Sequence, residues 1–365
     1  MKILLNITPS ELKIISGDVT YYLNLLDVPN DLLEFSIVQN TNKVFRFLDK
    51  IPSKLNRDFL PGKIKNWLFR YSRYHYISAR DLNSIDAILS HITFPWLPRN
   101  MTDQIPIIWS SQGISPPGYY EQYHQSFNHI VDMYNDFAPK CDLLLIWTKS
   151  CADIMLKHCN FATPVVIIPP ITKFYAPENI LPKNTQFHLL FVGRDARRKG
   201  LYDTLDAFAE LSRNNRDITF DIVSSLPEKI IKKLKTNPQI NYYSNISEKV
   251  KAQLLDRADI LILPTYAETY GYVMTEAMAY RCALITSNYE PLNELVVEGE
   301  NGFLVQPGDV KQIAHKIKLL VENPALIEEF KENNFRKYLN NFSKDAVIPK
   351  YFEAFSQIMC RKGGQ

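Results

Sequence analysis

The stretch from Ala258 to Ala279 reads ADILILPTYAETYGYVMTEAMA and holds three successive patterns. The apolar run Asp259–Leu263 predicts a buried strand, because parallel strands that are covered on both faces are almost entirely apolar. A loop with Glu268 and Gly271 follows, and a helix is expected to begin near Tyr272. A strand, a loop and a helix in this order predict one unit of an open α/β sheet.

The same unit recurs along the rest of the chain. Short apolar runs alternate with stretches of helical pattern, for example Leu201–Ser212 and Lys311–Glu322. The predicted fold class is therefore α/β, with two Rossmann-like, doubly wound domains. The expected strands are Lys2–Ile7, Glu34–Val38, Asp86–Leu89, Ile105–Trp109, Asp142–Trp147, Val165–Ile168, Phe187–Val192, Ile218–Val223, Asp259–Leu263 and Ala283–Thr286.

A proline-rich boundary divides the chain. Pro169, Pro170 and the loop beyond them separate the two series of strands. A first domain is expected over residues 1–170 and a second over residues 185–340, which agrees with a usual size of roughly 150 residues per domain. A last helix, at about 345–363, can return to either domain.

The composition excludes several classes of protein. The formal net charge is only +3, whereas a nucleic-acid-binding protein normally gathers a strong basic excess on one face. No stretch has the length and apolarity of a transmembrane helix, and the start of the chain lacks the pattern of a signal peptide. The five cysteines form no C-x-x-C pair, which favours reduced thiols and a cytoplasmic location.

Residues 43–80 differ from the rest of the chain in composition. They contain ten Lys or Arg residues, only two acids and several aromatic residues. Within them, Gly62–Ala79 is a candidate for a basic, aromatic helix that lies on an anionic membrane, which would make the protein peripheral at the inner face of the membrane. The alternative is an ordinary solvated face whose aromatic residues belong to the core.

A basic loop follows the expected strand Phe187–Val192. It begins at Gly193, contains Arg194 and Lys199, and ends at Gly200, where a helix is expected to begin. Ligands of open α/β sheets lie at the carboxyl ends of the strands, so both cations stand where an anion would bind. Arg can hold a phosphate through two parallel bonds, and Lys acts as a point charge. The alternative is a solvated basic turn.

Two acids flank the expected helix start at Tyr272. Free backbone N–H groups and the helix dipole favour an anion at such a start. Glu268 in the loop and Glu276 in the first turns of the helix can flank this anion, because carboxylates accept hydrogen bonds from the hydroxyls of a sugar or a ribose. A second pair at the same spacing, Glu290 and Glu298, lies outside any strand–loop–helix junction, so we expect it at the surface.

The order of these motifs resembles the donor domain of family 4 glycosyltransferases, which are retaining enzymes of the GT-B fold. The resemblance extends over residues 187–309, about a third of the chain, and implies two domains that face each other across a cleft. Its pieces are Gly193-Arg194 with Lys199-Gly200, Ala258-Asp259 with Pro264, Glu268 and Glu276 with Ala277-Met278-Ala279, Pro291 with Glu294, and Glu298–Val305 followed by Pro307-Gly308-Asp309.

The resemblance implies a role for each matching residue. Arg194 and Lys199 are expected to neutralise the donor diphosphate, Glu268 to hold hydroxyls of the transferred sugar, and Glu276 to lie near the ribose. Such enzymes generally work without a metal ion, and the chain has no D-x-D pair, so we expect neither a cofactor nor a metal site. The other expected donor-binding residues are Gly193, Thr269, Tyr270, Gly271 and Tyr272.

The first domain matches the family less closely. Gly17 is the single glycine where the resemblance implies a glycine-rich loop near the diphosphate. Gln112 takes the place of an active-site His of many members; a Gln can hydrogen-bond a sugar hydroxyl but does not titrate. His91 is a second candidate for a substrate contact, and the alternative is a structural histidine.

The sequence thus predicts a retaining, metal-independent glycosyltransferase. It would move a sugar from a nucleotide-diphosphate sugar to a glycan or lipid-linked acceptor, in surface polysaccharide synthesis. The alternative is a partner subunit that binds sugar nucleotides without catalysis, which Gln112 and the single Gly17 motivate. A nicotinamide-dependent oxidoreductase is excluded, because the G-x-G-x-x-G turn that it needs does not occur.

Overall fold

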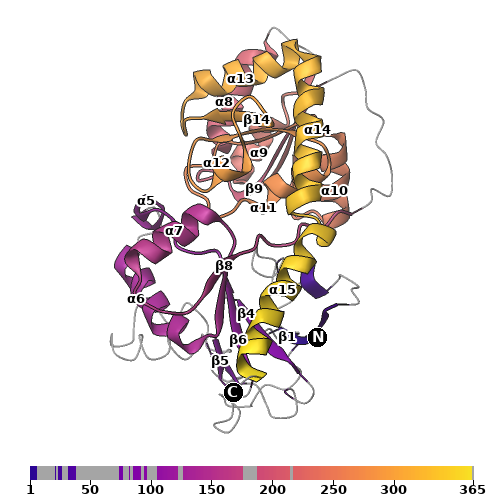
Figure 1. The fold of residues 1–365 in the computed structure, drawn as a ribbon. Helices are drawn as coiled ribbons and strands as arrows, with labels where there is room; N and C mark the ends of the chain where they lie inside the picture. Colours follow the sequence, from indigo (N-terminus) through magenta and orange to yellow (C-terminus); the bar gives the residue numbers. More distant parts are fainter. Residues whose placement is uncertain are drawn as a thin grey trace. The chain divides into compact units, whose positions relative to one another are not determined.

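The protein is described by a computed structural model and divides into two compact units. The first unit contains Met1–Ile114, Ser126–Ile171 and Val347–Gln365, and the second contains Ser115–Gln125 and Thr172–Ala346. Figure 1 shows the ribbon, coloured along the chain. The structure describes residues 1–5, 21, 24–26, 32–37, 74–76, 82, 85–91, 94–96, 105–121, 126–175, 187–213 and 217–363.

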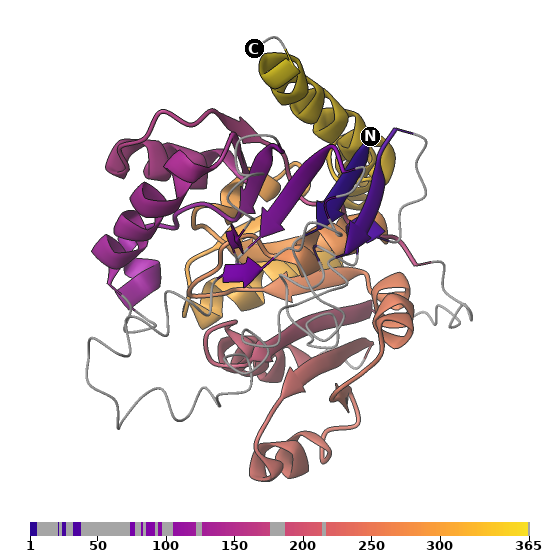
Figure 2. The same ribbon diagram turned by 90° about the horizontal axis from the view of Figure 1, so that it is seen from below.

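A parallel six-stranded sheet forms the centre of the first unit. Its strand order is β2-β1-β4-β6-β7-β8, and Figure 2 shows these strands side by side. The order reverses between β1 and β4, and ligands of open α/β sheets bind at the carboxyl ends of strands at such a reversal. The strands are β1 (Lys2–Leu5), β2 (Glu34–Ile37), β4 (Ala87–His91), β6 (Ile107–Ser111), β7 (Leu143–Ile146) and β8 (Val165–Ile167).

Helices connect the later strands of this sheet. Between β6 and β7 lie α6 (Phe127–Phe137) and a 3₁₀ turn (Ala138–Lys140), and α7 (Lys149–His158) leads from β7 to β8. The last helix, α15 (Lys344–Gly363), belongs to the first unit from Val347 onward. Two short strands, β3 (Tyr74–Tyr76) and β5 (Phe94–Trp96), form a separate parallel pair, and α5 (Pro117–Glu121) belongs to the second unit.

The second unit has a sheet of the same kind. Its order is β11-β10-β9-β12-β13-β14, all strand pairs are parallel, and the order reverses between β9 and β12. The ligand-binding edge of this unit is therefore expected where β9 and β12 end. The strands are β9 (Phe187–Asp195), β10 (Ile218–Ser225), β11 (Ile240–Tyr243), β12 (Ile260–Leu263), β13 (Ala283–Ser287) and β14 (Gly302–Val305).

The helices of the second unit cover both faces of its sheet. Because crossovers between parallel strands are right-handed, α8 and α9 lie on one face and α10 and α11 on the other. In addition, α13 packs on α8, and α14 packs on α11 (Figure 1). These helices and the short α12 are α8 (Leu201–Ser212), α9 (Glu228–Leu234), α10 (Glu248–Arg257), α11 (Tyr272–Ala279), α12 (Leu292–Leu295), α13 (Val310–Glu322) and α14 (Pro324–Asn341).

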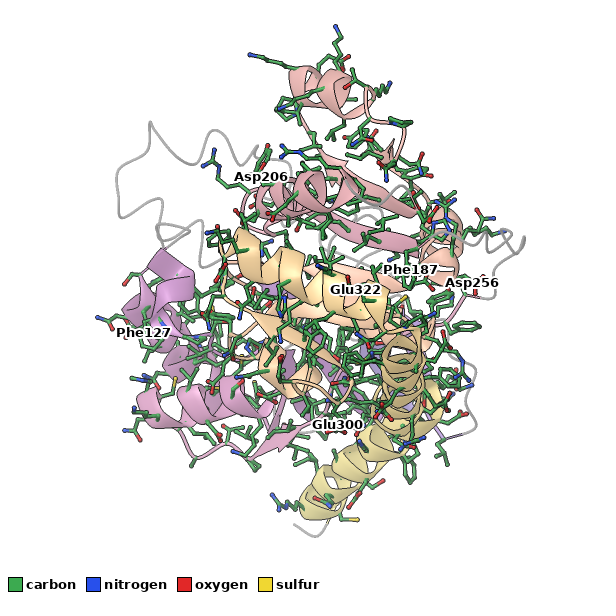
Figure 3. All side chains as sticks on the ribbon, turned by 90° about the horizontal axis from the view of Figure 1, so that it is seen from above. Phe127, Phe187, Asp206, Asp256, Glu300 and Glu322 are labelled. Atoms are coloured by element: carbon green, nitrogen blue, oxygen red, sulfur yellow. The ribbon has the colours of Figure 1, made fainter. Side chains whose placement is uncertain are left out.

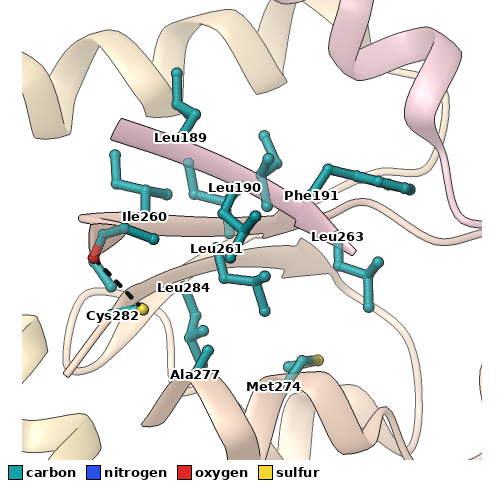
Figure 4. Close-up of a cluster of buried hydrophobic side chains, with 14 of the residues drawn as sticks. Leu189, Leu190, Phe191, Ile260, Leu261, Leu263, Met274, Ala277, Cys282 and Leu284 are labelled. Atoms are coloured by element: carbon teal, nitrogen blue, oxygen red, sulfur yellow. Dashed lines mark hydrogen bonds between the residues drawn. The ribbon is translucent and has the colours of Figure 1, made fainter. Parts of the chain in front are cut away.

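Apolar side chains hold these layers together. Figure 4 shows Leu190 of β9, Leu261 of β12 and Met274 of α11 in one fully buried cluster. Each such side chain stabilises the fold by about 1.5–3 kcal/mol relative to an exposed one. Helix α8 is amphipathic. It buries Leu201, Thr204, Ala207 and Phe208, which lie about one turn apart, whereas Asp206 is exposed (Figure 3).

The structure confirms the α/β prediction, and each expected strand is present with its bounds shifted by a few residues. Strands β5, β11 and β14 were not predicted. Strand β5 has only three residues, β11 has mixed polarity at the sheet edge, and β14 begins at Gly302 within a turn-rich stretch. The expected helix Gly62–Ala79 is wrong over Tyr74–Tyr76, which pair as strand β3; the remainder of residues 43–80 lies outside the described part.

All five cysteines are free, as expected for reduced thiols. Among the described residues, no helix is long and apolar enough to cross a membrane.

Candidate functional site

A close backbone contact brings two loops of the second unit together. The turn that follows β9 ends at Gly200, whose φ is +74°, a conformation that residues with a side chain rarely adopt. A Cβ atom on Gly200 would lie 2.2 Å from the carbonyl oxygen of Pro264, just after β12. The Tyr266 amide also donates to the Arg198 carbonyl at 2.8 Å. The basic loop and the acidic loop of the sequence therefore lie side by side at the reversal between β9 and β12.

The two loops meet in a cluster of charges. The Lys199 ammonium forms an ion pair with Glu268, and these side chains are only 14% and 10% exposed. Arg198 Nη1 lies 3.9 Å from the same Glu268 oxygen and donates to the carbonyl oxygen of Ala267 at 2.6 Å. Arg198 Nε lies 3.4 Å from the Asp195 carboxylate. The cluster holds two cations and two carboxylates at the end of β9.

Arg198 was missed by the sequence analysis, which paired Lys199 with Arg194. The structure places Arg194 at an exposed position near the end of β9 and turns Arg198 toward Glu268. The signal was the run of three basic residues at positions 197–199, but only the geometry of the turn decides which of them faces inward.

The surroundings of Lys199 disfavour its positive charge. Burial is the main cause, the neighbouring Arg198 guanidinium adds to it, and the Asp195 carboxylate opposes it. The pKa of Lys199 is lowered to about 7 as a result. This ammonium can therefore lose its proton near neutral pH, whereas a bound anion would favour the charged form.

This titration predicts how pH affects the binding of a nucleoside diphosphate. Below pH 7 Lys199 already carries its proton, so its titration leaves the affinity unchanged. Above pH 7 the complex must take up one proton, so the dissociation constant should rise toward about tenfold per pH unit. Titration calorimetry with UDP, GDP and ADP between pH 7 and 9 measures the slope. A flat profile for the nucleotide that binds would contradict this prediction, and Lys199→Met should abolish the slope.

The start of α11 completes this side of the site. Gly271 is the N-cap residue of the helix, with a φ of +79°, and as a glycine it has no side chain that could cap the helix. Glu268 Oε1 accepts the Thr269 amide at 3.0 Å, which fixes the carboxylate beside this start. Tyr270 is buried, and its ring centroid lies 5.2 Å from that of Tyr272. The expected donor-binding residues 269–272 thus form one continuous segment next to Glu268.

Glu276 lies in the same helix and has its own partner. It is buried, and its Oε1 accepts from the ammonium of Lys251 on α10 at 2.8 Å. Burial raises the pKa of Glu276, while Lys251 opposes the shift. Lys251 also pairs with Glu248 at 2.7 Å. Lys251 was not predicted, because it lies 25 positions before Glu276 in the sequence and no local motif connects the two.

The second acidic pair of the sequence lies at the surface, as predicted. Glu290 and Glu298 are both exposed. Glu298 accepts the Leu304 amide and pairs with Lys316 at 2.7 Å, so it fastens the turn before β14. This is a structural arrangement and not a ligand site.

The candidate residues of the first unit have different surroundings. Gln112 directly follows β6 and is partly buried, whereas Gly17 lies outside the described residues. His91 ends β4 and is buried; its Nδ1–H donates to the Ser110 carbonyl at 2.7 Å. Its ring stacks on Trp147 with centroids 4.9 Å apart. These contacts favour the structural interpretation of His91.

Comparisons with known proteins show what the second unit and the whole fold are similar to. A family model described as glycosyl transferases group 1 matches residues 176–337. The capsular polysaccharide biosynthesis glycosyltransferase CapM of Staphylococcus aureus is 28% identical over 170 residues, which cover 45% of this chain and 44% of that protein. The chain thus spans less than half the length of this curated relative.

Two solved structures resemble the whole chain. Sucrose-phosphate synthase from Thermosynechococcus elongatus has a TM-score of 0.70 at 16% identity and is covered over 99% of both chains. HepE from Anabaena, solved in complex with UDP and glucose, has a TM-score of 0.65 at 15% identity and is covered over 98% of this chain and 99% of that one.

The two parallel sheets and this likeness define the GT-B fold. The family model for glycosyl transferases group 1 matches residues 176–337, which lie within the second unit. Among the described residues, no group of three or more His, Cys, Asp or Glu side chains is arranged to hold a metal ion.

Proposed function

We propose that the protein is a retaining glycosyltransferase of family 4, which moves a sugar from a nucleotide-diphosphate sugar to a glycan or lipid-linked acceptor in surface polysaccharide synthesis. The observation that carries the proposal is the buried Lys199–Glu268 pair next to the start of α11. The match of residues 176–337 and the likeness to CapM support it. A peripheral position at the membrane, through residues 43–80, belongs to the same proposal.

Donor binding exchanges the partners of the two charges. In the structure the Glu268 carboxylate is the ion-pair partner of Lys199. A donor diphosphate replaces the carboxylate as the partner of Lys199, and Arg194, Arg198 and the start of α11 provide further positive potential. Glu268 is then free to accept hydrogen bonds from hydroxyls of the sugar, while Glu276 does the same for the ribose.

The reaction needs stabilisation of charge more than a strong base. When the bond between the anomeric carbon and the phosphate oxygen breaks, both electrons leave with the nucleoside diphosphate, and the cations around Lys199 stabilise this charge. The acceptor hydroxyl attacks the anomeric carbon on the same face. Its proton passes to the departing phosphate oxygen, so Gln112 need only orient a hydroxyl. The cations take over the electrostatic role that a metal ion has in other transferases.

Two assays test the function. UDP, GDP and ADP are compared in thermal shift, and the matching nucleotide sugars are then incubated with glycan and lipid-linked acceptors. We expect one nucleotide to raise the melting temperature and its sugar to be transferred with retention of the anomeric configuration. Tight donor binding without release of nucleoside diphosphate would point instead to a catalytically inactive partner subunit, which the Gln at position 112 motivates. Absence of nucleotide binding would refute both.

Glu276→Ala should lower sugar transfer at least about tenfold. The change removes the expected ribose contact and leaves the Lys251 ammonium without its buried partner on α11, a loss of about 1.4 kcal/mol in transition-state stabilisation. Steady-state rates at saturating acceptor measure it. Glu248→Ala is the matched control, because Glu248 pairs with the same Lys251 from an exposed position and should change the rate less than about threefold. Equal effects of the two variants would contradict the role of Glu276.

A further inference from the structure

Helix α10 brings a lysine to the carboxyl edge of the second sheet. In a sheet of parallel strands, each connecting helix begins beside the carboxyl end of the strand before it. Helices α10 and α11 follow β11 and β12, so the first turns of both helices lie at this edge. Ser247 fixes the start of α10, because its hydroxyl accepts the Val250 amide at 3.3 Å. Lys251 lies about one turn into α10, and Glu276 lies about one turn into α11.

The two oxygens of the Glu276 carboxylate have different surroundings. Oε1 accepts a hydrogen bond from the Lys251 ammonium at 2.8 Å. Oε2 makes no hydrogen bond within the described part of the chain, although the side chain is only 11% exposed. Each oxygen of a carboxylate can accept hydrogen bonds of its own. Lys251 therefore occupies one oxygen and leaves the other open to a hydroxyl of a ligand.

The ion pair also keeps the buried carboxylate charged. Burial raises the pKa of Glu276 and so favours the neutral acid, and the Lys251 ammonium opposes this shift. Burial disfavours the charge of Lys251 as well, but the carboxylates of Glu276 and Glu248 raise the pKa of Lys251 above its usual value. A charged carboxylate accepts stronger hydrogen bonds than a neutral acid does. Lys251 thus sets both the charge and the orientation of Glu276.

We propose that Lys251 is a positioning residue for the recognition of ribose, because it holds Glu276 as a carboxylate with Oε2 available to a ribose hydroxyl. The inference rests on the proposed function, in which Glu276 lies near the ribose of the donor. Lys251 acts through Glu276 and does not itself contact the nucleotide. Its removal should therefore weaken only those nucleotides that carry ribose hydroxyls. A pair that merely joined α10 to α11 would affect all nucleotides equally.

Titration calorimetry on the full chain tests this role. UDP, GDP and ADP are each compared with their 2′,3′-dideoxy forms, which lack both ribose hydroxyls. The wild type should bind its ribonucleotide about tenfold more tightly than the dideoxy form, through a hydrogen bond to a charged group. Lys251→Met should remove most of this preference and leave the affinity for the dideoxy form unchanged. Lys251→Arg keeps the charge and should keep the preference. Lys249→Met, at an exposed position of the same helix, should keep it as well.

The outcomes separate this inference from the proposed function. If Lys251→Met keeps the preference for ribose, or weakens both forms of the nucleotide equally, the positioning role is wrong and donor binding still stands. If the wild type binds both forms equally, Glu276 does not recognise the ribose and the inference fails, whereas sugar transfer would still support the proposed function. If no nucleotide binds, both are refuted. Lys251→Gln replaces the methionine variant if circular dichroism shows that the latter is unfolded.

Discussion

Lys199→Met should lower the rate of sugar transfer by about a hundredfold. Lys199 is the less exposed of the two cations in the charge cluster. A charge-assisted hydrogen bond from it to the departing diphosphate would stabilise the transition state by about 1.5–3 kcal/mol. Its loss also leaves Glu268 buried without its close cation, so the carboxylate would repel the donor. Rates at saturating donor, together with the dissociation constant of the nucleoside diphosphate, separate the effect on chemistry from the effect on binding.

A neighbouring residue supplies the control for this experiment. Arg197 lies in the same turn and has the same charge, but it is exposed. Arg197→Met should therefore change the rate less than about threefold, because exposed charges are screened by water and salt. Similar losses in both variants would mean that only the overall charge of the loop matters, and the specific role of Lys199 would be wrong.

Lys331→Met should destabilise the protein by about 3 kcal/mol. Lys331 on α14 is only 9% exposed at its side chain, and it pairs with Asp259 at the start of β12 at 2.7 Å. Although burial opposes its charge, the carboxylates of Asp259 and Glu328 raise the pKa of Lys331. Removal of one partner from such a buried pair is strongly destabilising, because the other charge stays behind. Urea-induced unfolding of the full chain measures the loss.

An exposed pair provides the comparison for stability. Lys318 and Glu322 lie 3.7 Å apart on α13 and are both about 60% exposed, so Lys318→Met should change stability by less than about 0.5 kcal/mol. The double variant Lys331→Met/Asp259→Leu should recover part of the loss, since no buried charge remains. If Lys331→Met were as harmless as Lys318→Met, the pair would not hold α14 on the sheet.

The sequence was sufficient for the parts of the fold that rest on local pattern. The apolar runs and the helix pattern of α8 predict their elements, because strand burial and helix amphipathicity leave a direct trace in residue spacing. Strand β11 left no such trace, since an edge strand of mixed polarity resembles a loop. The opposite error occurs at Tyr74–Tyr76. The sequence analysis placed this segment in a candidate helix, but it forms a strand because strand β5 is available to pair with it.

The site residues show the same difference between what local sequence pattern predicts and what depends on packing. Glu268 and Lys199 were found because each stands at the end of a predicted strand, and parallel strand ends share one edge of a sheet. Lys251 could not be found, because its contact with Glu276 depends on the packing of α10 against α11. Whether Arg194 or Arg198 faces inward depends on backbone angles of one turn, which residue type does not determine.

The contact between Gly200 and Pro264 matters for attempts to alter donor choice. Any larger residue at position 200 would push the two loops apart by roughly the width of a methyl group and would pull Lys199 away from Glu268. Libraries for new nucleotide sugars should thus keep position 200 constant and vary the exposed positions 194 and 197, where diversity leaves the backbone undisturbed.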